Sequence, residues 1–223
     1  MTYSVKEMFY TLQGEGAHTG RASVFCRFTG CNLWSGRESD RATSICTFCD
    51  TDFIGTDGEG GGKFATETDL ADAIAALWPT ATPVTDQREK PYVVFTGGEP
   101  ALQLSEALID ALHQHGFECA VESNGTRPLP ANLDWVCISP KGRSEVIIER
   151  CDELKLVFPQ PDAPPERFAH IEAGVRYLSP LNPFDIETLH PARETSTQAA
   201  IAYCMAHPEW RLTLQSHKVV NIA

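Results

Sequence analysis

Long apolar runs and positive charge are both scarce in this sequence of 223 residues. It holds no stretch of about eighteen apolar residues, which excludes a helix long enough to cross a bilayer. Lysine and arginine together number 18 against 30 acidic residues, giving a net charge of −12. Because a protein that neutralises phosphates needs a basic face, we expect no nucleic-acid partner.

A secretory signal is also missing from the opening residues, MTYSVKEMFY, which lack a basic segment followed by an apolar stretch. We therefore expect a cytoplasmic protein, in which clustered cysteines are more often metal ligands or catalytic groups than disulfide partners. The chain has eight cysteines. Those in short apolar runs are expected to be small buried side chains: Cys26, Cys119 and Cys137.

Strand-length apolar runs alternate with helix-patterned segments along the chain. The predicted strands are 22–28, 92–96, 117–123, 134–139, 153–158, 175–179 and 211–218. The predicted helices are 66–79, 102–116 and 195–208, and residues 55–63 are predicted to be a flexible Gly-rich loop. This alternation predicts an α/β fold with a mostly parallel sheet, in which ligands gather at the carboxyl ends of strands. With hydrophobic residues at 42%, we expect a single domain over 1–223.

Three cysteines cluster in the pattern C-x14-C-x2-C, from Cys31 to Cys46 and Cys49. A structural zinc ion needs four ligands, and His18 is one candidate for the fourth. A 4Fe–4S cluster held by three cysteines instead leaves one iron without a protein ligand. The spacing alone leaves zinc, an iron–sulfur cluster and coincidence open.

Two further features point to a ligand site. The segment TGGEP, residues 96–100, places two glycines and Glu99 at the end of a strand, where a backbone without Cβ atoms can approach a ligand. Glu99 is a candidate partner for a ligand ammonium group. Arg27 lies in an otherwise apolar strand, where its charge requires a partner. That partner is either a ligand carboxylate or an internal acid.

Several motifs in order make the sequence resemble the 7-carboxy-7-deazaguanine synthase family of radical S-adenosylmethionine (SAM) enzymes. The matching segments are FYTLQGEG (9–16), FCRFTGCNLW (25–34), FCDTDF (48–53), TGGEP (96–100), ESNG (122–125), SPK (139–141) and LQSHKVVNIA (214–223). The C-x14-C-x2-C spacing is typical of one subgroup of this family. The resemblance covers essentially the whole chain.

The resemblance implies a modified, incomplete radical-SAM (β/α) barrel that binds a 4Fe–4S cluster, SAM and Mg²⁺. The implied reaction converts 6-carboxy-5,6,7,8-tetrahydropterin into 7-carboxy-7-deazaguanine and ammonia in 7-deazapurine (queuosine) biosynthesis. A 5′-deoxyadenosyl radical would abstract the C6 hydrogen, and the cofactor would carry the difficult chemistry. Implied partners are the small-molecule pterin, an electron donor such as flavodoxin or ferredoxin, and a second copy in a homodimer.

The same resemblance implies a role for individual residues. The cluster ligands would be Cys31, Cys46 and Cys49, and Thr51 would bind Mg²⁺. The SAM-binding set would be Phe48, Cys49, Asp50, Gly98, Ser139, Pro140, Lys141, Ser179, Pro180, Leu181 and Asn182. The substrate-binding set would be Leu12, Gln13, Gly14, Glu15, Arg27, Thr96, His217 and Ala223, with the tail 211–223 closing the site.

Three departures from the family pattern affect these assignments. The sequence ends in Ala223, where the family often has a proline whose carboxylate faces the substrate. The segment LSPLNP, residues 178–183, replaces a Gln-Pro-x-Asp pattern that contacts SAM in the family. Ser123 of ESNG stands where threonine is usual.

Overall fold

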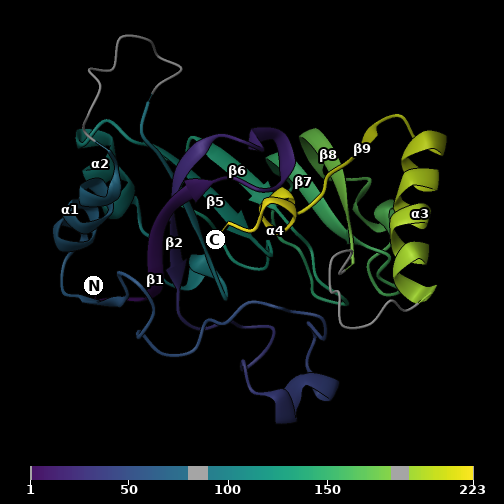
Figure 1. Ribbon diagram of the computed structural model, residues 1–223, viewed down its shortest axis with the longest axis horizontal. Helices are drawn as coiled ribbons and strands as arrows, with labels where there is room; N and C mark the ends of the chain where they lie inside the picture. The colour runs from purple at the N-terminus through teal and green to yellow at the C-terminus, as the bar shows by residue number, and fades with distance from the viewer. Residues whose placement is uncertain (1, 80–89, 182–190, 223) are drawn as a thin grey trace.

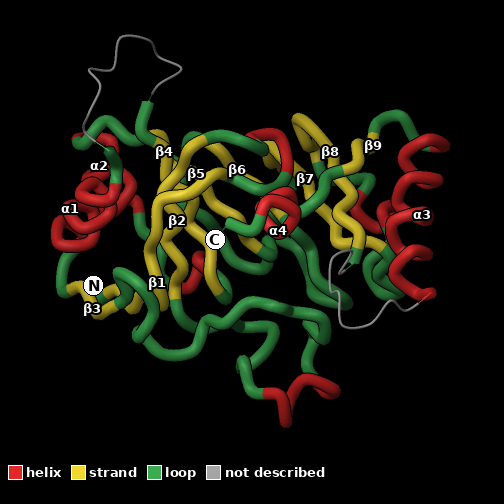
Figure 2. The backbone as a smooth tube through the Cα atoms, viewed as in Figure 1, coloured by secondary structure: helices red, strands yellow, loops and turns green. Residues whose placement is uncertain are grey.

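The computed structural model describes residues 2–79, 90–181 and 191–222. Its centre is a nine-stranded sheet in the order β3-β1-β2-β4-β5-β6-β7-β8-β9. The strands are β1 (Tyr3–Leu12), β2 (Ala22–Phe28), β3 (Gly62–Phe64), β4 (Tyr92–Gly97), β5 (Glu118–Ser123), β6 (Trp135–Ile138), β7 (Arg150–Phe158), β8 (Glu172–Pro180) and β9 (Trp210–Leu212). Figure 2 shows that β3 and β9 lie at opposite edges, so the sheet is not closed.

One strand of the sheet, β1, runs in the opposite direction to the others. Strand β1 runs antiparallel to both β2 and β3, whereas every neighbouring pair from β2 to β9 is parallel. This confirms the predicted α/β class with an incomplete barrel and a mostly parallel sheet. Because of this reversal, the carboxyl end of β1 lies beside the start of β2, where Leu12 pairs with Ala22.

Helices cover the sheet in two groups (Figures 1 and 2). Helices α1 (Glu67–Leu77) and α2 (Glu106–Gln114) contact each other and pack on the first half of the sheet, and α3 (Pro191–Ala206) packs on β7, β8 and β9. Leu108 and Leu112 of α2 are fully buried, as their spacing predicted. Burial of this apolar surface is the main stabilising term for each helix.

A capping box begins α1. The Thr66 hydroxyl accepts a hydrogen bond from the Asp69 N–H at 3.1 Å, and the Asp69 carboxylate accepts one from the Thr66 N–H at 3.0 Å. The two residues thus satisfy N–H groups that the first turn of a helix cannot pair internally.

Three segments differ from the sequence-based prediction. The predicted tail strand 211–218 was wrong beyond residue 212, because Ser216–Val220 form the short helix α4. The long strand β1 was not among the predicted strands. The Gly-rich loop contains β3, and Gly61 is packed so closely that a Cβ would overlap the Lys6 carbonyl. The backbone at Gly61 therefore packs directly against β1.

Two other predictions concern burial and membrane spans. The three cysteines expected in the core are buried: Cys26, Cys119 and Cys137. Within the described ranges, no helix combines the length and the apolar composition that crossing a membrane requires.

We expect Thr66→Ala to lower the free energy of unfolding by about 1 kcal/mol, because it removes the side-chain cap of α1. Urea denaturation followed by circular dichroism measures this change. Thr68→Ala is the matched control, since Thr68 is exposed in the same first turn and does not cap it. Equal effects of the two substitutions would contradict a stabilising cap.

Candidate active site

A cavity of about 540 Å³ runs across one face of the sheet. One wall comes from the carboxyl ends of the parallel strands, where Thr96, Ser123, Ser139 and Ser179 line it. The opposite wall comes from the loop after β1, at Leu12–Glu15, and from the tail. The cavity thus lies at the expected carboxyl ends of the parallel strands. It also extends to the loop after β1, because β1 runs in the opposite direction and ends beside the start of β2.

The three clustered cysteines meet at one end of this cavity. Cys31, Cys46 and Cys49 all line it, together with Phe48 and Thr51. The three thiols supply one ligand fewer than the four of a closed zinc site, and they equal the number that holds a 4Fe–4S cluster with one open iron.

The sulfur atoms have different electrostatic environments. A hydrogen bond to Cys49 raises the pKa of the Cys46 thiol, and the same bond lowers the pKa of Cys49. Burial raises the pKa of Cys31, although the backbone N–H groups of Leu33 and Trp34 counteract this. The Leu33 N–H donates to Cys31 Sγ at 3.4 Å. Backbone donors aimed at sulfur are a feature of thiolate ligand sites.

Two glycines at the end of β4 let the cysteine loop pack against the sheet. Gly97 has φ +135°, and a Cβ there would overlap the Phe28 carbonyl. A Cβ on Gly98 would overlap the Gly30 carbonyl and lie 2.9 Å from Cβ of Cys31. These glycines were expected to admit a ligand. In the structure they also admit the backbone that leads to the first cysteine.

Arg27 lies at the end of β2 and lines the cavity beside Thr96, its register partner on β4. Its Nε donates to Glu7 Oε1 at 2.7 Å. The internal ion pair that the sequence left open is therefore present, and Arg27 faces the cavity as well. Arg27 and Thr96 together provide hydrogen-bond donors on one side of the pocket.

A buried lysine lies at the centre of the polar wall. Lys155 of β7 is 3% exposed, and its Nζ contacts Glu15 Oε2 at 2.8 Å and Glu122 Oε2 at 2.7 Å. Burial alone would lower the pKa of Lys155, but the carboxylates of Glu122 and Glu15 raise it well above its usual value. The Gln13 Nε2 also donates to Glu122 Oε1 at 3.0 Å. Both acids face the cavity.

The tail covers the other side of the cavity. Ser216 N and Oγ both donate to the Gly14 carbonyl, at 3.0 and 2.8 Å. His217 packs so closely on Gly14 that a Cβ there would overlap Nδ1 of the ring. Burial lowers the pKa of His217, which favours the neutral imidazole. Lys218 Nζ contacts Asp50 Oδ2 at 2.6 Å, linking the tail to the cysteine loop.

The structure brings most of the predicted site residues together in this cavity. Those that line it are Leu12, Gln13, Gly14, Glu15, Arg27, Phe48, Asp50, Thr51, Thr96, Gly98, Ser139, Lys141, Ser179, Pro180, Leu181, His217 and the three cysteines. Pro140 is buried and is not among the lining residues. Asn182 and Ala223 lie outside the described residues. His217 belongs to a helix, and its prediction as a strand residue was wrong.

Two candidates from the sequence do not reach the cavity. Glu99 is fully buried, and its carboxylate accepts hydrogen bonds from Ala101 N, Ser123 Oγ and Asn124 N. It binds the protein's own backbone, which corrects the expected role with a ligand ammonium. His18 lies against the rings of Tyr92 and Trp135 and does not line the cysteine cavity, so it is no zinc ligand.

The sequence reasoning missed Glu122 and Lys155. Glu122 opens the quoted motif ESNG without having been assigned a role. Lys155 interrupts the apolar run LKLVF, much as Arg27 interrupts its own strand. The argument that a charge in a buried strand requires a partner would have identified it.

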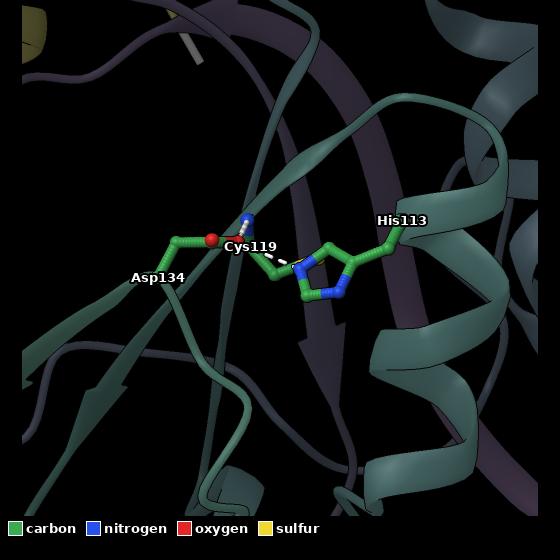
Figure 3. A group of neighbouring side chains, drawn as sticks. All are labelled: His113, Cys119 and Asp134. Carbon is green, nitrogen blue, oxygen red and sulfur yellow. Dashed lines mark hydrogen bonds and ion pairs between the residues drawn. The ribbon is translucent and has the colours of Figure 1, made fainter.

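One group of metal-ligating side chains lies elsewhere, at the end of α2 (Figure 3). His113 Nε2 and Asp134 Oδ2 are 2.8 Å apart, and the same carboxylate oxygen accepts a hydrogen bond from the Cys119 N–H at 2.7 Å. These hydrogen bonds explain why the three side chains lie together: they link α2 to the strands β5 and β6.

An unclosed, mostly parallel sheet with a cavity that joins three cysteines to a polar pocket defines an incomplete (β/α) barrel enzyme. The chain is 59% identical to the 7-carboxy-7-deazaguanine synthase of Bordetella pertussis and 57% identical to that of Caulobacter vibrioides, over the full length of each. The crystal structure of QueE from Escherichia coli superposes with a TM-score of 0.66 at 27% identity, covering 97% of this chain and 95% of that one. A search of family profiles gave no match.

These similarities identify the chain as a member of the 7-carboxy-7-deazaguanine synthase family.

We expect Lys155→Met to lower the free energy of unfolding by about 3–5 kcal/mol, because it leaves buried carboxylates without a counter-charge. The pH dependence should also change. In the wild type burial raises the pKa of Glu15, but the charge and hydrogen bond of Lys155, with smaller contributions from His217 and Gln215, lower it below its ordinary value. The resulting stabilisation is present above the ordinary pKa and is lost as pH falls through the lower folded value. In the variant the unpaired acids favour protonation, so stability should decline as pH rises from about 5 to 8.

Urea denaturation across this pH range measures both effects. Lys63→Met is the control, since Lys63 is exposed on β3. A Lys155→Met protein with wild-type stability and pH dependence would contradict the role of Lys155 as a buried counter-charge.

Proposed function

We propose that this protein converts 6-carboxy-5,6,7,8-tetrahydropterin into 7-carboxy-7-deazaguanine and ammonia in queuosine and related 7-deazapurine biosynthesis. Family membership over the whole chain supports this reaction. The observation that carries it is the single cavity in which three cysteines and a pocket of Arg27, Glu15, Glu122 and Lys155 open to each other. A small planar ligand held in that pocket would lie next to a reactive group at the cysteines.

The cysteine end fits a 4Fe–4S cluster bound by Cys31, Cys46 and Cys49. The supply of three protein thiols at one end of the cavity supports a cluster with one open iron. When bound, the cluster and SAM would supply the 5′-deoxyadenosyl radical that removes the C6 hydrogen of the substrate. The protein provides position and a cavity of limited solvent access.

The SAM-binding residues would surround the space between the cysteines and the polar pocket. Phe48, Asp50 and Gly98 line it beside the cluster loop. The carboxyl ends of β6 and β8 contribute the rest: Ser139, Lys141, Ser179, Pro180 and Leu181. Lys141 Nζ is already directed at the Ser139 carbonyl and hydroxyl, which holds its charge at the end of β6. Asn182 and the backbone of Pro140 complete the proposed set.

The substrate would lie in the polar pocket with its two ends recognised differently. Arg27, Thr96 and His217 would hold the carboxylate, since a guanidinium and a hydroxyl donate to its oxygens. Glu15 and Glu122 would accept hydrogen bonds from the N–H groups of the aminopyrimidinone edge, and the backbone of Leu12–Gly14 would contact the ring. Lys155 Nζ contacts one oxygen of each acid and so fixes the orientation of both carboxylates.

Thr51 would bind Mg²⁺ through its hydroxyl oxygen. In this structure the Thr51 hydroxyl and backbone N–H both hydrogen-bond to the Cys49 sulfur. A hydroxyl has one proton and two lone pairs, so donating to sulfur leaves its oxygen able to bind a hard cation.

The remaining parts of the proposal concern assembly. The tail from residue 211 onward would close the substrate site, which the contacts of Ser216, His217 and Lys218 support. We propose a single domain over 1–223, a homodimer, and a flavodoxin or ferredoxin as electron donor.

Anaerobic reconstitution with iron and sulfide, followed by the pterin, SAM and dithionite, should yield 7-carboxy-7-deazaguanine. Absence of that product from protein with an intact cluster would overturn the proposal, and 5′-deoxyadenosine without it would indicate a different radical SAM reaction. Cys31→Ala should lose the cluster and the activity, because it removes a thiolate ligand. Cys204→Ala is the matched control and should retain iron, sulfide and turnover, since Cys204 lies on α3.

Omitting Mg²⁺ should reduce turnover, and Thr51→Val should be about tenfold or more less active than the wild type and insensitive to Mg²⁺. Valine replaces the hydroxyl with a methyl group of similar size, whereas Thr51→Ser keeps the oxygen and should respond to Mg²⁺. Steady-state assays with and without the ion measure this. Full wild-type activity in metal-depleted buffer would exclude the role given to Thr51.

A further inference from the structure

The long insertion between the first two cysteines forms an exposed excursion from the cavity. It leaves after Leu33 and returns at Cys46, where the N–H groups of Ile45 and Cys46 donate to the Leu33 carbonyl at 3.1 and 3.4 Å. Its 3₁₀ helix, Glu38–Thr43, contains no buried residue and projects away from the sheet (Figures 1 and 2). Little apolar burial fixes this segment, so its shape depends on polar contacts.

Side chains of the insertion hydrogen-bond to the backbone of the C-x2-C turn. Ser44 Oγ donates to the Cys46 carbonyl at 2.8 Å. Arg41 Nη1 donates to the carbonyls of Thr47 and Cys49, at 3.3 and 2.9 Å. One guanidinium thus spans the turn that carries two of the three cysteines.

Arg41 is itself held in place from two sides. Its Nε donates to Glu38 Oε2 at 2.7 Å, and its guanidinium carbon lies 4.1 Å from the centre of the Trp34 ring. Trp34 is 7% exposed, lines the cavity, and packs edge-on against Phe53. Because Trp34 is anchored in the cavity wall, the cation stacked on it has a fixed position.

Fixing these carbonyls also fixes the direction of an N–H group. The Thr47 carbonyl and the Phe48 N–H belong to one trans peptide and point in opposite directions. The carbonyl points to Arg41, and the Phe48 N–H hydrogen-bonds to the Cys46 sulfur. Hydrogen bonds to sulfur and nearby positive charge both stabilise an added electron on a thiolate-bound cluster.

We propose that the insertion is a clamp for the C-x2-C turn and that Arg41 is its positioning residue. Arg41 draws the carbonyls of Thr47 and Cys49 outward, which presents the Cys46 and Cys49 sulfurs and the Phe48 N–H to the cluster. This inference rests on the proposed function only in taking the bound group to be an iron–sulfur cluster. It assigns a purpose to the fourteen intervening residues.

The test uses the full-length protein reconstituted anaerobically, with variants Arg41→Gln, Arg41→Lys and Arg37→Gln. Arg37→Gln is the matched control, since Arg37 is exposed on the same loop and loses the same charge. The measurements are iron and sulfide per chain, the rate of iron loss to a ferrous chelator, and the midpoint potential by electron paramagnetic resonance. Circular dichroism checks folding.

Arg41→Gln should lose iron about tenfold faster than the wild type and have a more negative midpoint potential, as expected when a partner of a metal ligand is removed. Arg41→Lys should keep part of the effect on the potential but lose iron faster than the wild type, because an ammonium on the Trp34 ring has no second nitrogen to donate to Glu38 and its position is less fixed. Arg37→Gln should match the wild type. If Arg41→Gln fails to fold, the iron-loss rate of Arg41→Lys decides the test.

The inference would be overturned if Arg41→Gln lost iron at a rate within about twofold of the wild type and its midpoint potential equalled that of the wild type within experimental error. Equal changes in Arg41→Gln and Arg37→Gln would overturn it as well. A wild-type protein that holds the cluster but forms no deazaguanine would overturn the proposed reaction alone. Normal product formation with an unaffected Arg41→Gln cluster would overturn the clamp alone.

Discussion

The polar end of the cavity depends on the ion pairs of one buried ammonium, that of Lys155. It joins Glu15, in the loop after β1, to Glu122 at the end of β5, from its own position on β7. These three segments are far apart in the sequence, and their charges would be costly to bury separately. The ammonium offsets part of the charge of the two acids and so allows acidic side chains to line the cavity.

A second constraint is the absence of side chains where backbones cross. Gly97 and Gly98 allow the segment before Cys31 to pass directly over the end of β4, and Gly14 leaves room for the His217 ring. The position of the cysteine end of the cavity therefore depends on a close backbone crossing, and that of the polar end on a close contact with the His217 ring. The distance between the cysteines and the polar pocket follows from both.

Much of the fold could be predicted from periodicity and apolar runs. The parallel strands β2, β4 and β5 and the capped helix α1 matched their predicted ranges closely, because their patterns reflect local burial. Strand β1 was missed, since MFYTL shares a run with charged residues, and its pairing with β2 and, at its start, with β3 is visible only in the structure. The tail was assigned as a strand from its mixed pattern, yet only tertiary contacts with Gly14 and Asp50 determine its helical turn. Most of the residues named from the motifs line the cavity. The position of Lys155 in an apolar run could have identified it, whereas the contacts of Arg41 emerge only from the fold.

Two segments far apart in the sequence wall the polar end of the cavity. One is Leu12–Glu15 at the end of β1, and the other contributes Gln215, His217 and Lys218. All three clustered cysteines precede the second segment in the sequence, so they leave the ribosome before it does. The cysteine end of the cavity is therefore translated first, and the polar end gains this wall later.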